Sequence, residues 1–151
     1  MSVTYIPAGV RRFVISRALR LCEYCLFHED DAFFAFEIDH VISEKHGGLT
    51  TAGNLALSCL FCNRNKGSDI ATLATNSVSL VRLFNPRLDL WSEHFRLSDD
   101  LRVVGVTEVG HATIRVLDFN TPDRIQERHE LRTVGRFPSV AAVTVMRRTR
   151  P

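Results

Sequence analysis

The chain has 151 residues, a length that suits one domain around one hydrophobic core. Its composition, 45% hydrophobic and 24% charged, excludes a disordered, collagen-like or coiled-coil chain. The formal net charge of +2 is too small to establish a polyanionic partner. All but two of the 19 lysine and arginine residues are arginine, which suits phosphate binding but is explained equally well by a GC-rich coding sequence.

The sequence contains no apolar run of the roughly 18 residues that a membrane helix needs. Residues 1–7 also lack the basic and apolar regions of a signal peptide. We therefore expect a cytoplasmic protein that does not enter a membrane. In a reducing compartment, paired Cys-x-x-Cys motifs indicate metal ligands rather than disulfides.

The N-terminal part is predicted to form a helix and then a strand. Apolar residues recur at spacings of three and four across residues 8–21, which indicates an amphipathic helix with a basic outer face. Only Arg17 falls within the apolar stripe. Residues 32–42 are rich in aromatic and β-branched residues, which favours a strand or hairpin that ends at Asp39 and His40.

A loop, a second strand and a second helix are predicted next. Residues 43–53 contain three glycines together with serine and threonine, which is typical of a loop. Residues 54–58 indicate a short strand, residues 59–62 a turn, and residues 63–73 a helix that Gly67 could shorten. The order of this segment is therefore strand, loop, strand, helix.

The second half contains an α/β extension over about residues 80–137. Residues 93–97 and 101–106 favour a hairpin around a polar turn. Residues 112–119 fit either a strand or a short helix, and that choice stays open. Threonine followed by proline at residues 121–122 is typical of a helix start, so we expect a helix to about residue 134.

All four cysteines fall in two Cys-x-x-Cys pairs, which form the four-cysteine cluster of Cys22, Cys25, Cys59 and Cys62. Each such pair makes a tight turn that supplies two thiolates to one tetrahedral ion. We predict a zinc knot, in which a structural Zn²⁺ has four sulfur ligands and no position for water. Buried or redox-active thiols are the alternative, but a redox Cys-x-x-Cys needs a βαβ context that this sequence does not indicate.

Polar residues are dense between and just after the two cysteine pairs. Hydrolysis of a phosphodiester needs a base with a pKa near neutral, a divalent ion and a rigid frame. His40 can act as the base, and Asp39 offers a hard oxygen ligand that suits Mg²⁺ or Mn²⁺. Each residue also has a structural alternative: a core histidine for His40, turn caps for Asp39 and Asn54, and a helix N-cap for Asn63.

The ordered set resembles the HNH endonucleases, in particular their cysteine-flanked group. The resemblance covers about residues 22–67 and rests on the order Cys-x-x-Cys, Asp-His, Gly-Gly, Asn-Leu and Cys-x-x-Cys-Asn-x-x-Lys. It implies an α+β fold with a ββα-metal core at about residues 22–73, held together by the structural zinc knot. We expect this core to belong to a single domain of residues 1–151.

The resemblance implies roles for four residues. His40 would activate water as general base, with one ring nitrogen oriented by a backbone carbonyl of the following loop, and Asn54 would hold that loop by hydrogen bonds. Asp39 and Asn63 would hold the single catalytic ion. Many members of the family have histidine where this chain has Asn63, and an amide oxygen shifts the preference toward Mg²⁺ or Mn²⁺ and away from softer ions.

The remaining charged residues carry less specific predictions. Glu37 is placed to support the base or a neighbouring arginine, while Lys45, His46, Arg64 and Lys66 are predicted nucleic-acid contacts, for which exposed surface is an equally good account.

Arginines also recur in the C-terminal part of the chain. Arg124, Arg128 and Arg132 alternate with glutamates, which favours ion pairs over a DNA-binding face. The basic tail at residues 147–151 suits a disordered arm that contacts phosphates.

The sequence thus predicts a metal-dependent DNA endonuclease that leaves 5′ phosphate and 3′ hydroxyl ends, as the resemblance implies. DNA is the expected partner, and a double-strand cut would need two copies, as in a homodimer, or two events. Two alternatives stay open. One is a zinc-knot module that binds nucleic acid without cutting it, and the other is a nuclease for RNA or structured nucleic acid.

Overall fold

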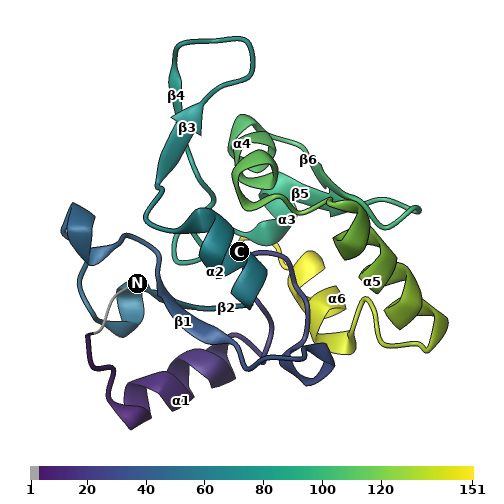
Figure 1. Ribbon diagram of the computed structural model, residues 1–151, viewed down its shortest axis with the longest axis horizontal. Coiled ribbons are helices and arrows are strands. Elements are labelled where there is room, and N and C mark those ends of the chain that lie inside the picture. Colours follow the sequence, from purple (N-terminus) through teal and green to yellow (C-terminus); the bar gives the residue numbers. More distant parts are fainter. Residues whose placement is uncertain (1–3) are drawn as a thin grey trace.

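The computed structural model describes residues 4–151, in which helices accompany three separate two-stranded hairpins, and the predicted α+β class is confirmed (Figure 1). The helices are α1 (Ala8–Arg17), α2 (Leu60–Lys66), α3 (Trp91–His94), α4 (Glu108–Leu117), α5 (Pro122–Thr133) and α6 (Val140–Met146). The antiparallel strand pairs are β1 (Glu37–His40) with β2 (Leu55–Ser58), β3 (Ala71–Leu73) with β4 (Leu80–Arg82), and β5 (Phe95–Leu97) with β6 (Val103–Gly105). Residues 1–3 lie outside the described part of the chain. The predicted domain of residues 1–151 and the segment of residues 1–7 that was compared with a signal peptide both begin there.

Helix α1 is shorter than the predicted helix of residues 8–21. Leu19 and Arg20 adopt left-handed backbone conformations, with φ of 54° and 59°, which end the helix. Leu21 then forms a β-bridge with His28 instead of a further helical turn. The chain therefore leaves the helix axis directly before the first Cys-x-x-Cys pair. Phe13, one of the apolar residues that recur at spacings of three and four in residues 8–21, is 54% exposed, so the expectation that this stripe is buried was wrong at Phe13.

Strands β1 and β2 pair along their whole length, from Glu37 opposite Ser58 to His40 opposite Leu55. The predicted second strand is confirmed, and the intervening loop has only two short 3-10 turns. The first strand is shorter than predicted, because the chain before residue 37 stays irregular. There Phe33 is 95% exposed, so the aromatic residues that suggested a longer strand do not lie in a sheet.

Helix α2 begins three residues earlier than predicted. The Cys59 thiol caps its start by accepting a hydrogen bond from the Cys62 amide, so Asn63 lies inside the helix and the N-cap alternative for it was wrong. Gly67, with φ of 51°, ends the helix well before residue 73. Residues 71–73 belong instead to β3, which with β4 forms an unpredicted hairpin that projects from the molecule (Figure 1).

The C-terminal half follows its predictions more closely. The hairpin of β5 and β6 and the helix α5 are confirmed, and residues 112–119 prove to be mainly helical, within α4. Helix α6 was not predicted. Buried side chains from the two halves, including Val14, Leu57, Phe95 and Phe119, form one continuous cluster. The extension therefore packs on the same core as the cysteine region.

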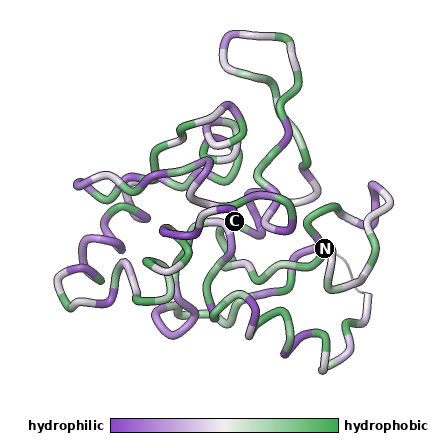
Figure 2. The backbone as a smooth tube through the Cα atoms, turned by 180° about the vertical axis from the view of Figure 1, so that it is seen from behind, coloured by the Kyte–Doolittle hydropathy of each residue, from purple (hydrophilic) through white to green (hydrophobic). Residues whose placement is uncertain are grey.

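Arginines of α5 serve structure rather than a DNA-binding face. The helix is mostly hydrophilic in Figure 2, yet Arg128 is fully buried and its Nη1 donates to the Leu101 carbonyl at 3.1 Å. Arg124 pairs with Glu127 at 3.0 Å, one of the ion pairs that the sequence favours, and Arg132 donates to the Asp99 carbonyl at 3.0 Å.

The basic tail is not a free arm, contrary to prediction. Arg150 pairs with Glu93 at 2.7 Å and donates to the Leu88 carbonyl at 3.1 Å. No helix within residues 4–151 is long and apolar enough to cross a membrane. The cytoplasmic location stays a prediction.

Candidate active site and cysteine cluster

The four-cysteine cluster is formed as the sequence predicted. All four Sγ atoms lie within 4.8 Å of one another, and all four cysteines are buried. The Cys25 and Cys59 sulfurs are 3.7 Å apart. Thiolates about 2.3 Å from a tetrahedral Zn²⁺ stand roughly 3.8 Å apart, so the donor set and its spacing suit a structural zinc.

His40 ends β1 and is held by the loop that follows. Its Nε2 lies 2.9 Å from the Thr50 hydroxyl, which in turn donates to Glu44 at 3.3 Å. We infer that the Thr50 oxygen accepts from His40 Nε2–H, because the hydroxyl proton is directed toward Glu44. In this tautomer Nδ1 carries the lone pair, and it has no hydrogen-bond partner among residues 4–151. The partner of Nε2 is thus a side-chain hydroxyl and not the backbone carbonyl that the resemblance implied.

Asn54 connects the two ends of the same loop. Its amide nitrogen donates to the Ile42 carbonyl at 2.8 Å and to the Leu49 carbonyl at 3.0 Å, while its oxygen accepts from the Ile42 amide at 2.9 Å. All three contacts go to backbone. These hydrogen bonds orient the loop that carries Thr50, and therefore the imidazole of His40.

Asp39 is buried in a hydrogen-bonded group that the sequence analysis did not foresee. Its Oδ2 accepts from the Tyr24 hydroxyl at 2.6 Å and lies 3.1 Å from the Lys66 ammonium. Burial raises the pKa of Asp39, and Lys66 and Tyr24 oppose that rise. Lys66 is only 2% exposed, so its prediction as a nucleic-acid contact was wrong. It supplies the counter-charge that a buried carboxylate requires.

Glu37 and Asn63 face each other across β1 and α2, since the Asn63 amide donates to Glu37 Oε2. Glu37 therefore supports Asn63 rather than the base. With Asp39 and His40 they line one cleft of about 850 Å³. The amide oxygen of Asn63 has no partner among the described residues, and Asp39 Oδ1 has only a 3.4 Å contact to Lys66. These two hard oxygens, next to the Glu37 carboxylate, suit Mg²⁺ or Mn²⁺.

Comparison with known families matches residues 22–69 to the family model described as HNH endonuclease. The chain carries an HNH endonuclease domain. The family implies a ββα-metal fold, and the elements β1, β2 and α2 follow in that order within the HNH domain. The domain implies a nuclease, which is a hydrolase acting on nucleic acid. Searches of curated proteins and of solved structures gave no match.

A residue from outside the HNH domain contacts the cysteine cluster. The Arg124 guanidinium of α5 lies 3.2 Å from Cys25 Sγ and 3.7 Å from Cys59 Sγ, and it stacks over Phe27 and Phe61. Burial disfavours its charge, but the thiolates outweigh burial and raise its pKa. Because four thiolates around Zn²⁺ carry a net charge of −2, this buried cation offsets part of that charge.

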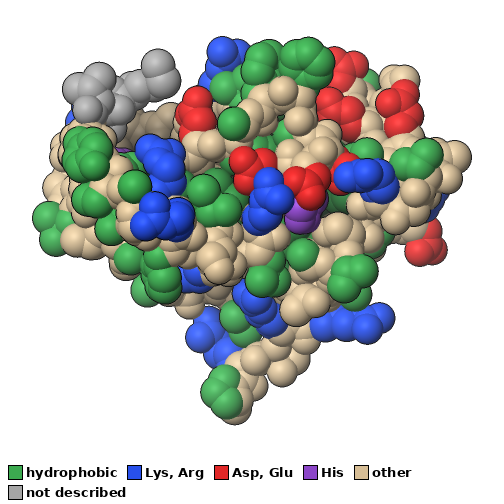
Figure 3. Space-filling view, turned by 90° about the horizontal axis from the view of Figure 1, so that it is seen from below, with side chains coloured by type: hydrophobic (Ala, Val, Ile, Leu, Met, Phe, Trp, Pro, Cys, Tyr) green, Lys and Arg blue, Asp and Glu red, His purple; other side chains and the backbone are tan. Residues whose placement is uncertain are grey.

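The other predicted contacts lie at different places on the HNH domain. Lys45 and Arg64 are exposed and line the cleft, as a contact to nucleic acid requires. His46 is exposed but is not among the residues that line it. Basic and acidic side chains are interspersed on the face seen in Figure 3, so no broad basic patch covers that face.

Gly48, the second glycine of the Gly-Gly pair, packs closely against Ile42 and Asn54, which lie at the two ends of its loop. A Cβ atom on Gly48 would lie 1.7 Å from the Ile42 carbonyl oxygen and 2.7 Å from the Asn54 amide. We expect Gly48→Ala to displace the Asn54 hydrogen bonds, cost about 2 kcal/mol or more of unfolding free energy and lower nuclease activity.

Gly53→Ala is the matched control, because its Cβ would meet only the Thr51 hydroxyl at 3.9 Å. Urea unfolding and cleavage rates of the two variants test the contrast. Equal stability and equal activity would show that the loop is not tightly packed at Gly48.

Proposed function

We propose that the HNH domain is a metal-dependent endonuclease that hydrolyses phosphodiester bonds of DNA, with His40 as general base. The observation that carries this proposal is the orientation of the imidazole. Its Nε2 is occupied by Thr50, and its Nδ1 is left unpaired among residues 4–151, in a cleft that also holds Asp39 and Asn63. A base needs such an available lone pair within reach of a water molecule.

The proposed reaction starts when His40 Nδ1 takes a proton from water. The hydroxide attacks phosphorus in line, the bond from phosphorus to the 3′ oxygen breaks, and the leaving oxygen takes a proton from solvent, to which His40 later returns its own. The products are a 5′ phosphate and a 3′ hydroxyl. Thr50 keeps the proton of the neutral ring on Nε2, which makes it a positioning residue for the base.

Asp39 and Asn63 are the proposed ligands of the catalytic Mg²⁺ or Mn²⁺, and Glu37 fixes the amide of Asn63 so that its oxygen can face the cleft. Such an ion neutralises charge that develops on the phosphate and on the departing oxygen. Lys66 and Tyr24 both contact Asp39 Oδ2. Asp39 Oδ1, which has only the 3.4 Å contact to Lys66, is the oxygen that we propose for the ion.

Lys45 and Arg64 are the proposed phosphate contacts, since both are exposed at the rim of the cleft. Two such contacts are few, and the net charge of the chain is only +2. We therefore propose weak binding of nucleic acid that depends moderately on salt, because the salt dependence grows with the number of phosphates neutralised.

The proposal is tested by incubating the purified full chain with supercoiled plasmid and Mg²⁺ or Mn²⁺. Conversion to the nicked form, suppressed by a chelator, is expected, and end labelling should find 5′ phosphates. A parallel reaction with single-stranded and duplex RNA separates the RNA nuclease alternative. DNA binding in a gel-shift experiment without cleavage in any divalent ion would favour the binding module and contradict the proposal.

Substitutions of Asn63 test most directly whether the proposed ion site exists. We expect Asn63→Ala to lose activity in Mg²⁺, with partial rescue at high Mn²⁺. Asn63→His should remain active and shift its preference toward softer ions, because imidazole favours them. Nicking rates across a series of divalent ions measure both effects.

Asn65→Ala is the control for this series. Asn65 lies in the same helix, but its amide donates to the Leu117 carbonyl at 2.9 Å, away from the cleft. This variant should lose some stability and keep the ion preference of the parent protein. An unaltered ion preference in both Asn63 variants would leave Asp39 as the only ligand supported.

A further inference from the structure

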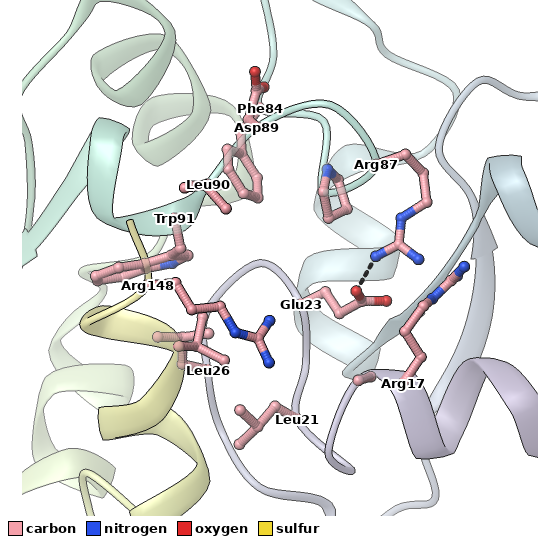
Figure 4. A pocket seen from close by; sticks show the side chains of 13 residues that line it. Arg17, Leu21, Glu23, Leu26, Phe84, Arg87, Asp89, Leu90, Trp91 and Arg148 are labelled. Carbon is pink, nitrogen blue, oxygen red and sulfur yellow. Dashed lines mark hydrogen bonds and ion pairs between the residues drawn. The ribbon is translucent and has the colours of Figure 1, made fainter. Parts of the chain in front are cut away.

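A second pocket of about 300 Å³ lies outside the cleft, between the end of α1, the segment after β4, and α6 (Figure 4). Its polar wall carries three arginines, and its apolar wall includes buried aromatic rings. The residues that define it are Arg17, Glu23, Phe84, Arg87, Trp91 and Arg148. None of them lines the catalytic cleft, so this pocket is a separate feature of the molecule.

The carboxylates at this pocket do not balance its positive charge. Both oxygens of Glu23 are used, because one accepts from the Leu57 amide at 2.9 Å and the other from Arg87 Nη2. Asp89 forms a two-point ion pair with Arg82 outside the pocket. Two further cations, Arg17 and Arg148, also line the pocket, and no carboxylate among residues 4–151 pairs with either of them.

Several of the guanidinium nitrogens are buried without an acceptor. Arg87 Nε and Nη1 and Arg17 Nε have no hydrogen-bond partner among residues 4–151, although the other nitrogens of Arg17 donate to backbone carbonyls. Buried donors are satisfied in the large majority of cases, so three orphans at one place point to a missing acceptor. Burial lowers the pKa of Arg17, and the nearby Arg87 charge lowers it further, while the Glu23 carboxylate opposes this shift without cancelling it.

We propose that this pocket binds a phosphate group, with Arg17, Arg87 and Arg148 as its ligands. Figure 4 shows Arg148 on one side of Glu23 and Arg87 on the other, with Arg17 beyond Glu23 and its guanidinium turned away from Arg148. Only Nε of Arg17 is left for a ligand, because its other two nitrogens donate to backbone carbonyls. A phosphate presents oxygens in several directions and accepts from arginines that approach from different sides. The volume is near the lower end for ligand pockets and is sufficient for a phosphate with a small attached group.

The phosphate group comes either from free phosphate or from a phosphate of nucleic acid, and the pocket chemistry is the same for both.

Binding is measured by titration calorimetry of the zinc-loaded full chain with inorganic phosphate, at ionic strength matched with chloride. We expect saturable binding that Arg148→Ala weakens by at least about tenfold. The Arg148 side chain is exposed and makes no hydrogen bond or ion pair among residues 4–151, so its removal should change the melting temperature little.

Arg147→Ala is the matched control, since Arg147 is exposed next to Arg148 but does not line the pocket. It should bind phosphate within about twofold of the parent. Arg87→Gln is the second test variant, because glutamine keeps a donor for Glu23 but removes the charge. Melting curves with and without phosphate then show whether a folded Arg87→Gln protein has lost the stabilisation that phosphate gives the parent.

The two sources are separated with a short oligonucleotide, with and without a 5′ phosphate, as competitor. Displacement of inorganic phosphate by either form identifies nucleic acid as the source, and displacement by neither identifies a free anion; both results support the pocket. Absence of saturable phosphate binding to the parent overturns the proposal, as does equal weakening by Arg147→Ala and Arg148→Ala. This readout is independent of cleavage and therefore of the proposed nuclease function.

Discussion

Replacement of His40 by alanine is expected to slow plasmid nicking by roughly 10²- to 10⁴-fold, the contribution typical of a general base. DNA affinity and zinc content should stay at the level of the parent, because Thr50 is the one side chain among the described residues that is hydrogen-bonded to the imidazole. The backbone carbonyl of His40, which accepts from Lys66 at 3.1 Å, is kept in the alanine variant. The loss should therefore appear in the rate and not in assembly of the site.

His46→Ala is the control for this experiment, because it removes an exposed histidine of the same loop that does not line the cleft. Its nicking rate should stay within about twofold of the parent rate, as for most surface substitutions. Single-turnover nicking in Mg²⁺, together with melting curves, compares the two variants. A rate for His40→Ala within tenfold of the parent would mean that another group activates the water.

The region that could be predicted from sequence is the one where spacing along the chain fixes geometry. A Cys-x-x-Cys pair brings two thiolates to one side of the chain, so the meeting of the two pairs at one ion could be predicted from the motif. The second pair does so from the start of α2 rather than from the separate turn that was predicted. The role of Asn54 was implied by the resemblance and not by its spacing, and the side chain makes three hydrogen bonds to the backbone of the loop. The elements β3, β4 and α6 were missed, and strands of three residues and a helix of seven leave little periodic signal. The equally short β5 and β6 were predicted with the help of the polar turn between them.

Contacts between residues far apart in sequence account for the errors at the site. Lys66 follows the last cysteine as a basic residue of a helix, which is typical of surface, yet it lies against Asp39, 27 residues earlier. Arg124 contacts Cys25 from 99 residues away. In both cases a buried charge requires an opposite charge nearby, but spacing in the sequence does not identify which residue supplies it. Thr50 is a related case, because any hydroxyl of the loop could have been the partner of His40.

The second large effect that we expect is loss of the folded cysteine cluster when one of its thiolates is removed. We expect purified protein to hold one zinc per chain and Cys59→Ser to hold much less. A structural zinc contributes about 10–16 kcal/mol of apparent binding free energy, as much as or more than the roughly 5–15 kcal/mol net stability of a typical domain. The effect should reach beyond the HNH domain, because Arg124 connects α5 to Cys25 and Cys59 and would be left buried without its anionic partners.

Phe61→Ser is the matched control for Cys59→Ser. Phe61 lies in the same Cys-x-x-Cys turn and is 49% exposed, so its replacement keeps all four thiolates and removes only a partly exposed ring over Arg124. It should retain one zinc per chain and a cooperative melting transition, while Cys59→Ser should lose both, as should the parent protein after prolonged chelation. Zinc is quantified by plasma mass spectrometry on protein purified without chelators, and folding by circular dichroism. A folded parent protein without zinc would contradict the prediction, because the core of the HNH domain would then be stable on packing alone.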